Sequence, residues 1–208
     1  DYLTHIWNLT SMMDHPIIAK EEDQDEACYR QFYEEAISLC RQKRFHEVLE
    51  KCRYTSLDDE EEYSIDVIQP EKIEFKQNSY EDGENSIISF PEFLLLVLDV
   101  CTGGEQPASH YQPDKLIEKF DALKTYFTAG EFYEKMLYYR LLLDYYTIRR
   151  DIKDGQGNYS LILKGPKDDS DKLKQYQSML YVSTEAFYNW LKPYLRKLEQ
   201  DELHSCAE

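Results

Sequence analysis

The chain has 208 residues, of which 42% are hydrophobic and 31% are charged, and its 41 acidic and 24 basic residues give a formal net charge of −17. An acidic field of this size repels phosphate, so the composition argues against autonomous DNA binding. The longest apolar run, residues 93–100, is interrupted by Asp99 and is far shorter than the roughly 20 residues of a membrane-spanning helix. The 18 Tyr and 9 Phe, against 7 Gly and 7 Pro, favour aromatic-rich helix packing over a turn-rich sandwich.

The cysteines indicate a reducing compartment. Their number is odd and they form no Cys-x-x-Cys pair, so we expect free thiols, a cytoplasmic location and no structural zinc. The sequence begins at Asp1 rather than Met, and residues 2–13 already have helical spacing. We therefore expect one helical domain, 1–208, that is a fragment of a longer protein, with residues 1–64 as a candidate subdomain. The cysteines are Cys28, Cys40, Cys52, Cys101 and Cys206.

Helical spacing predicts the first elements of the chain. We expect helices over residues 2–13 and 27–51, the second with an apolar stripe that includes Phe32, Ala36 and Leu39. Residues 65–68 and 72–75, separated by Pro70, form a candidate two-stranded ribbon.

Capping signals predict where the next helices begin. Ser89 followed by Pro91 is typical of a helix start, so residues 93–101 are expected to enter the core. Pro113 is expected to open a further helix, whose apolar residues include Phe120 and Leu123.

Residues 131–151 predict a buried central helix, because apolar side chains occupy nearly all of its faces. Arg140 and Asp144 lie in the middle of this segment. An isolated charge without solvent costs several kcal/mol, so both residues need partners or access to a cleft. The tyrosines at 138, 139, 145 and 146 suit core packing better than the alternative, which is stacking on nucleic-acid bases.

The C-terminal third adds a turn, a short extended segment and two helices. We expect the turn at 154–158, the extended segment at 159–163, and helices over 172–182 and 185–200, the second capped by Ser183 or Thr184. The chain is therefore predicted to be all-α, a multi-helix bundle of about seven helices with at most a minor β-ribbon.

Four residues are candidates for an interdomain or nucleic-acid contact: Arg140, Asp144, Arg149 and Arg150. Arg140 precedes Asp144 by four residues, the weaker orientation for a pair within one helix, which favours partners on other helices. The pair is interpreted as a buried network that fixes helix register, or alternatively as an interdomain contact. A catalytic role for Asp144 is the third interpretation, but no second carboxylate, nucleophile or metal ligand has a recognisable spacing from it.

Arg149 and Arg150 are expected to end the central helix, where positive charge complements the helix dipole. With Lys153, Lys164 and Lys167 they could instead form a basic patch for nucleic acid or an acidic neighbouring domain.

Several sequence blocks between about residues 87 and 195 carry a further signal. They are FPEFLLLVL at 90–98, PDKLIEKF at 113–120, MLYYRLLLDYYTIRRD at 136–151, Tyr159-Ser160-Leu161, YQSMLYVST at 176–184 and Trp190-Leu191. In sequence and in order, these blocks resemble the GmrSD-type family of modification-dependent restriction and phage-defence proteins, and residues 87–200 are assigned as the family-like helical core.

The resemblance implies a position in a larger protein. Family members carry an N-terminal ParB-like nucleotide-hydrolysing domain, a helical middle region and a C-terminal His-Asn-His nuclease domain, and this chain resembles only the middle. The first domain's Asp-Gly-Gln-Gln-Arg signature is absent, because Gly157 and Asn158 follow Asp154-Gly155-Gln156. The five histidines are too scattered for a nuclease metal site. At Leu96, family members often have His.

The leading hypothesis is a non-catalytic helical module that links the nucleotide-hydrolysing domain to the nuclease domain. It implies no cofactor or metal in this segment, partners that are the two adjacent domains, and contact with DNA only through the full-length protein. The alternative is an acidic protein–protein interaction adaptor or DNA mimic with no associated nuclease. A third, enzymatic option places hydrolysis at Arg140 and Asp144.

Overall fold

The computed structural model describes residues 26–48, 86–152, 159–163, 165–166, 170–183 and 186–205. The helix expected over 2–13, the ribbon expected at 65–75 and the turn at 154–158 lie outside these ranges. The α-helices described are α3 (Glu26–Arg41), α5 (Phe90–Cys101), α6 (Leu116–Leu123), α7 (Ala129–Tyr146), α8 (Ser170–Ser183) and α9 (Leu191–Ser205). Short 3₁₀ helices span Ala108–Tyr111, Pro113–Lys115 and Phe187–Asn189, and the strands are β1 (Arg149–Ile152) and β2 (Tyr159–Ile162).

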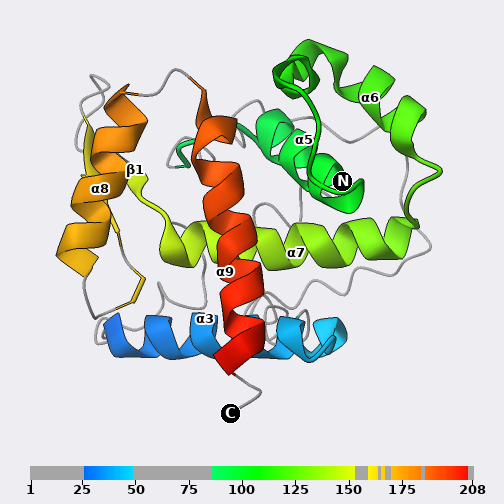
Figure 1. The fold of residues 1–208 in the computed structure, drawn as a ribbon. Coiled ribbons are helices and arrows are strands. Elements are labelled where there is room, and N and C mark those ends of the chain that lie inside the picture. The colour runs from blue at the N-terminus through cyan, green and yellow to red at the C-terminus, as the bar shows by residue number, and fades with distance from the viewer. Residues whose placement is uncertain are drawn as a thin grey trace, which may run out of the picture.

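Helix α7 is the centre of the fold (Figure 1). It contacts α3 and α5 on different sides, and α9 lies across it. Its start is fixed by Thr128, whose hydroxyl accepts from the Glu131 amide at 3.2 Å while the Glu131 carboxylate accepts from the Thr128 amide at 2.7 Å. Eleven of its residues are buried, so the predicted central helix is confirmed: Phe132, Met136, Leu137, Tyr138, Tyr139, Arg140, Leu141, Leu142, Leu143, Asp144 and Tyr145.

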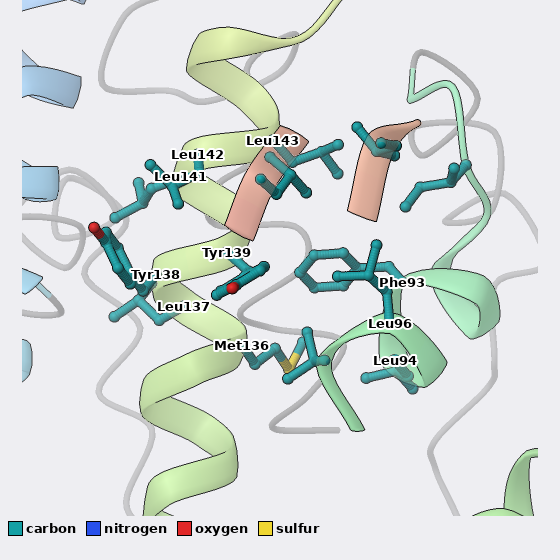
Figure 2. Close-up of a cluster of buried hydrophobic side chains, with 14 of the residues drawn as sticks. Phe93, Leu94, Leu96, Met136, Leu137, Tyr138, Tyr139, Leu141, Leu142 and Leu143 are labelled. Atoms are coloured by element: carbon teal, nitrogen blue, oxygen red, sulfur yellow. The ribbon is translucent and has the colours of Figure 1, made fainter. Parts of the chain in front are cut away.

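Helix α5 supplies the second half of the main core. Phe93 and Leu96 point toward Tyr139 and Met136 of α7 in Figure 2, and Phe93, Leu96 and Met136 are fully buried. Leu141 of α7 points in the opposite direction, toward α3 (Figure 2). Because two apolar faces of α7 are each covered by another helix, nearly every side of its sequence has to be apolar.

The start of α5 is where the sequence predicted it. Ser89 precedes the helix in an extended conformation, and Pro91 lies in the first turn. The Glu92 carboxylate accepts from both the amide and the hydroxyl of Ser89, at 2.8 and 2.7 Å. This arrangement satisfies polar groups that an uncapped helix end leaves open.

The helix expected over residues 27–51 is interrupted. Helix α3 ends at Arg41, and helical residues resume only at 45–48. Lys43 adopts a left-handed φ of 59°, and the Arg44 amide donates to the Leu39 carbonyl at 2.9 Å. These are the features of a Schellman C-cap, normally formed with Gly. The sequence did not predict this break, because the left-handed position after the helix holds Lys43 and not the Gly that usually indicates a helix end.

The predicted end of the central helix is wrong. Helix α7 stops at Tyr146, and Arg149 and Arg150 belong to β1, which pairs antiparallel with β2 in the register Arg149–Ile162 and Arg150–Leu161. Neither arginine therefore caps the helix dipole. The all-α class with a minor ribbon is confirmed, and the ribbon joins the end of the central segment to the extended segment predicted at 159–163.

Two further helix starts differ from prediction. The segment after Pro113 first forms a 3₁₀ turn and becomes α-helical only at Leu116. The segment expected as a helix from residue 185 has a 3₁₀ turn at Phe187–Asn189 before α9. Pro193 lies in the first turn of α9, where its missing N–H has no helical partner to lose. Within the described ranges, no helix combines the length and apolar character needed to cross a membrane.

Candidate functional site

The candidate site lies at the junction of α7, β1 and α8. Arg140 and Asp144 are one turn apart on α7, where the guanidinium Nη2 lies 3.0 Å from Oδ1 and Nε donates to Oδ2 at 3.1 Å. Arg149 of β1 brings its Nη2 to 3.6 Å from the same Oδ1. The three residues are between 2% and 5% exposed. The intrahelical pair thus forms despite its unfavourable orientation, and the partner from another element is Arg149.

Burial dominates the electrostatics of this cluster. Burial raises the pKa of the Asp144 carboxyl, and the neighbouring Arg140 and Arg149 guanidinium groups oppose that rise. Burial likewise lowers the pKa of Arg140, which the Asp144 charge counteracts. Each charge is therefore tolerated because its partner is in place, and removing one partner leaves the other charge buried.

Arg150 does not join this cluster. Its Nη2 donates to the Ser86 carbonyl at 2.7 Å and so ties β1 to the segment that precedes α5. Arg149 is buried, and Arg150 is partly buried. The lysines at 153, 164 and 167, which were expected to extend a basic patch, lie outside the described residues.

The space beside the Arg140–Asp144 pair is small. A cavity of about 10 Å³ is lined by Ser86, Leu143 and Thr147 together with the charged residues. Such a volume holds about one water molecule. In the part of the chain that the structure describes, no group of three or more His, Cys, Asp or Glu side chains is placed to hold a metal ion.

Gln177 of α8 completes the junction and was not singled out from the sequence. Its Oε1 accepts from the Ile148 amide at 2.8 Å, and its Nε2 donates to the Tyr146 carbonyl at 2.7 Å. The side chain is 3% exposed. It therefore satisfies the backbone groups that are released where α7 ends and β1 has not begun. A buried amide cannot be identified from helical spacing alone, although Gln177 lies within one of the family-like blocks.

A second buried polar cluster surrounds Asp99 and was also missed. Asp99 is fully buried, and its carboxylate accepts from Lys192 Nζ at 2.8 Å, from the Gln106 amide at 2.9 Å and from the Tyr111 hydroxyl. Lys192 is in α9, 93 residues away in the sequence. In the sequence, the only sign of this cluster was the Asp99 charge within the apolar run of α5. Local spacing could not identify Lys192 as its partner, because the two residues lie far apart in the sequence.

His110 is buried beside α5. Its Nε2 lies 2.9 Å from the Leu95 carbonyl, so this nitrogen carries the hydrogen and Nδ1 is an unprotonated acceptor. Nδ1 is buried and has no hydrogen-bond partner among the described residues. Burial lowers the pKa of His110, and the ring remains neutral at neutral pH.

No family model, curated protein or solved structure matches this chain.

Proposed function

We propose that this chain is a non-catalytic helical module of a GmrSD-like modification-dependent restriction and phage-defence protein. In this proposal it links a nucleotide-hydrolysing domain to a His-Asn-His nuclease domain and holds them in a controlled relation. The observation that carries the proposal is that polar residues of the family-like blocks form buried contacts with one another and with the backbone. Arg140, Asp144 and Arg149 pair with one another, and Gln177 bonds to the backbone between α7 and β1.

A linking module has to keep its own elements in fixed register if it is to set the geometry of its neighbours. In this proposal, directional contacts between buried polar groups specify that register. Here those contacts join α7 to β1 and α8, and the Asp99 cluster joins α5 to α9. The reactive groups, the nucleotide and the divalent metal belong to the neighbouring domains in this proposal.

The proposal places the chain in the cytoplasm, and Cys40 and Cys101 are free thiols in the described part. The test is the reading frame on both sides of this segment, followed by co-purification. The upstream frame is expected to encode the Asp-Gly-Gln-Gln-Arg signature and the downstream frame a His-Asn-His motif. The two flanking regions, expressed separately, are expected to bind the purified chain. Flanking regions without either motif would contradict the proposal.

The second candidate is an acidic adaptor that docks a basic partner. A shallow hollow of about 420 Å³ favours it, lined by Glu34, Glu35, Ser38 and Leu39 of α3 and by Glu47 of the following segment. Basic partners bind such surfaces with a strong dependence on ionic strength. Capture of a basic protein that is lost at high salt, by a chain whose gene encodes no nuclease, would support this adaptor over the linking module.

A further inference from the structure

A small polar pocket lies where the end of α7, β1 and the segment before α5 meet. Its volume is about 10 Å³, and its lining includes Ser86, Thr147 and the charged residues Arg140, Asp144 and Arg149. The three charged residues are only 2%, 5% and 5% exposed. Their charges are therefore largely shielded from water and have to be balanced within the pocket.

The charges of the lining residues do not balance. Two guanidinium groups, which stay protonated in proteins, face one carboxylate, so the lining carries an excess of one positive charge. Arg150 places a third guanidinium beside the pocket, since its Nη2 donates to the Ser86 carbonyl at 2.7 Å. An uncompensated buried charge is costly, so the pocket favours an anion.

The excess positive charge belongs mainly to Arg149. Asp144 is paired most closely with Arg140, because its Oδ2 accepts from Arg140 Nε at 3.1 Å and its Oδ1 lies 3.0 Å from Arg140 Nη2. Within the described ranges, the ionic partner of the Arg149 guanidinium is the same Oδ1, at 3.6 Å. This separation is longer than a hydrogen bond, so the five N–H donors of Arg149 can serve a further acceptor.

The Ser86 hydroxyl is a second donor at the pocket. Its Oγ accepts from the Ile88 amide at 3.4 Å, which leaves the hydroxyl hydrogen for another acceptor. The backbone of Arg149 is fixed by the pairing of β1 with Ile162 of β2. One charged and one neutral donor are thus held in the lining of the same pocket, and the charged one makes the stronger bond to an anion.

The size of the pocket selects the anion. A volume of about 10 Å³ holds about one water molecule. Phosphate, sulfate and carboxylate groups contain several heavy atoms and are too large, so a monatomic anion is the class that fits. Chloride is less strongly hydrated than the smaller fluoride and is therefore less costly to bury.

We propose that this pocket binds one chloride ion, which accepts hydrogen bonds from the Arg149 guanidinium and the Ser86 hydroxyl and neutralises the excess positive charge. The ion joins the segment before α5 to the junction of α7 and β1, so the stability of the fold depends on chloride. This site is independent of the proposed linking function, which requires no anion.

Thermal unfolding of the full chain in different sodium salts tests the proposal. The ionic strength is held at about 0.15 M, so that general screening is the same in each salt. Chloride and bromide should raise the unfolding temperature by about 3 °C relative to gluconate, which is too large for the pocket. Equal unfolding temperatures in the three salts would overturn the proposal in favour of an acid of the chain itself. Asp151 and Glu84, each two residues from a lining residue, would then be the first to consider.

The variant Arg149→Gln removes the excess charge and leaves the Arg140–Asp144 pair in place. The rise in chloride should disappear in this variant. Lys124→Gln is the matched control, because it removes one positive charge from the exposed pair with Asp121, and it should keep the full rise. A rise that persists in folded Arg149→Gln, or that both variants lose equally, would be a general salt effect and would overturn the proposal.

A crystal of the unmodified chain grown in bromide gives a test that depends on no variant. Bromide scatters anomalously, and its peak is expected in the pocket within about 3.5 Å of an Arg149 nitrogen and of Ser86 Oγ. A pocket without an anomalous peak would overturn the proposal. A bromide peak in a protein whose stability does not depend on halide would be an adventitious ion only, and it would equally overturn the proposal.

Discussion

Gln177 accepts a hydrogen bond from the Ile148 amide at 2.8 Å and donates one to the Tyr146 carbonyl at 2.7 Å, so one side chain of α8 bonds on both sides of the point where the central helix becomes a strand. A helix that ends inside a protein leaves backbone groups that need partners. Here one buried amide provides two of them, and it couples the end of α7 to α8.

The first prediction concerns this amide. Gln177→Leu should lower the free energy of unfolding by about 1–3 kcal/mol, because the buried Ile148 amide loses its partner and the Tyr146 carbonyl keeps only its bond from the Tyr194 hydroxyl. Urea unfolding measures the difference. Gln175→Leu is the control, since Gln175 is an exposed residue of the same helix, and it should change stability by no more than about 0.5 kcal/mol. Equal effects of the two substitutions would show that the Gln177 bonds do not stabilise the junction.

The second prediction concerns the buried charges. Asp144→Ala should destabilise the fold by about 3–5 kcal/mol, because Arg140 and Arg149 lose their carboxylate partner while their guanidinium groups stay buried. Asp121→Ala removes the exposed Lys124–Asp121 pair and should cost less than about 1 kcal/mol. Chemical denaturation of both variants tests the contrast. A mild effect of Asp144→Ala would mean that the cluster is open to solvent.

Some features of this fold could be predicted from the sequence and others could not. Local signals predicted the start of α5 at Ser89 and the burial of α7, since both depend on residues a few positions apart. The end of α7 was missed because Thr147 to Asp151 continue the helical spacing, while the strand they enter is specified by pairing with β2. Lys192 could not be assigned to Asp99 because their contact spans 93 residues.

The third prediction is a dependence of stability on pH. Burial lowers the pKa of His110 below its ordinary value of 6.5, so the unfolded chain takes up the proton first as the pH falls. The contribution of His110 is present in full above pH 6.5 and is lost below it, by at most about 1.4 kcal/mol per pH unit. Unfolding measured at pH 7 and pH 5.5 should show a smaller loss for His110→Gln than for the unmodified chain. An unchanged loss would assign the effect to other groups.

The fourth prediction concerns thiol reactivity. Burial raises the pKa of the Cys101 thiol to about 11, so little thiolate forms at pH 8. Alkylation of Cys101 by iodoacetamide in the native chain should be slower than in the urea-unfolded chain by on the order of 100-fold. Mass spectrometry of the peptide that contains Cys101 separates it from the other cysteines. Similar rates in the two states would show an accessible, ionised thiol.

The central claim is that this chain positions other domains and does no chemistry itself. Calorimetric titration of the purified chain with nucleoside triphosphates and Mg²⁺ tests it most directly. The account predicts no specific heat of binding, from a chain that is helical without either ligand. Binding with a Kd tighter than about 10 µM, equivalent to about −7 kcal/mol, that is lost in a folded Asp144→Asn variant would contradict it.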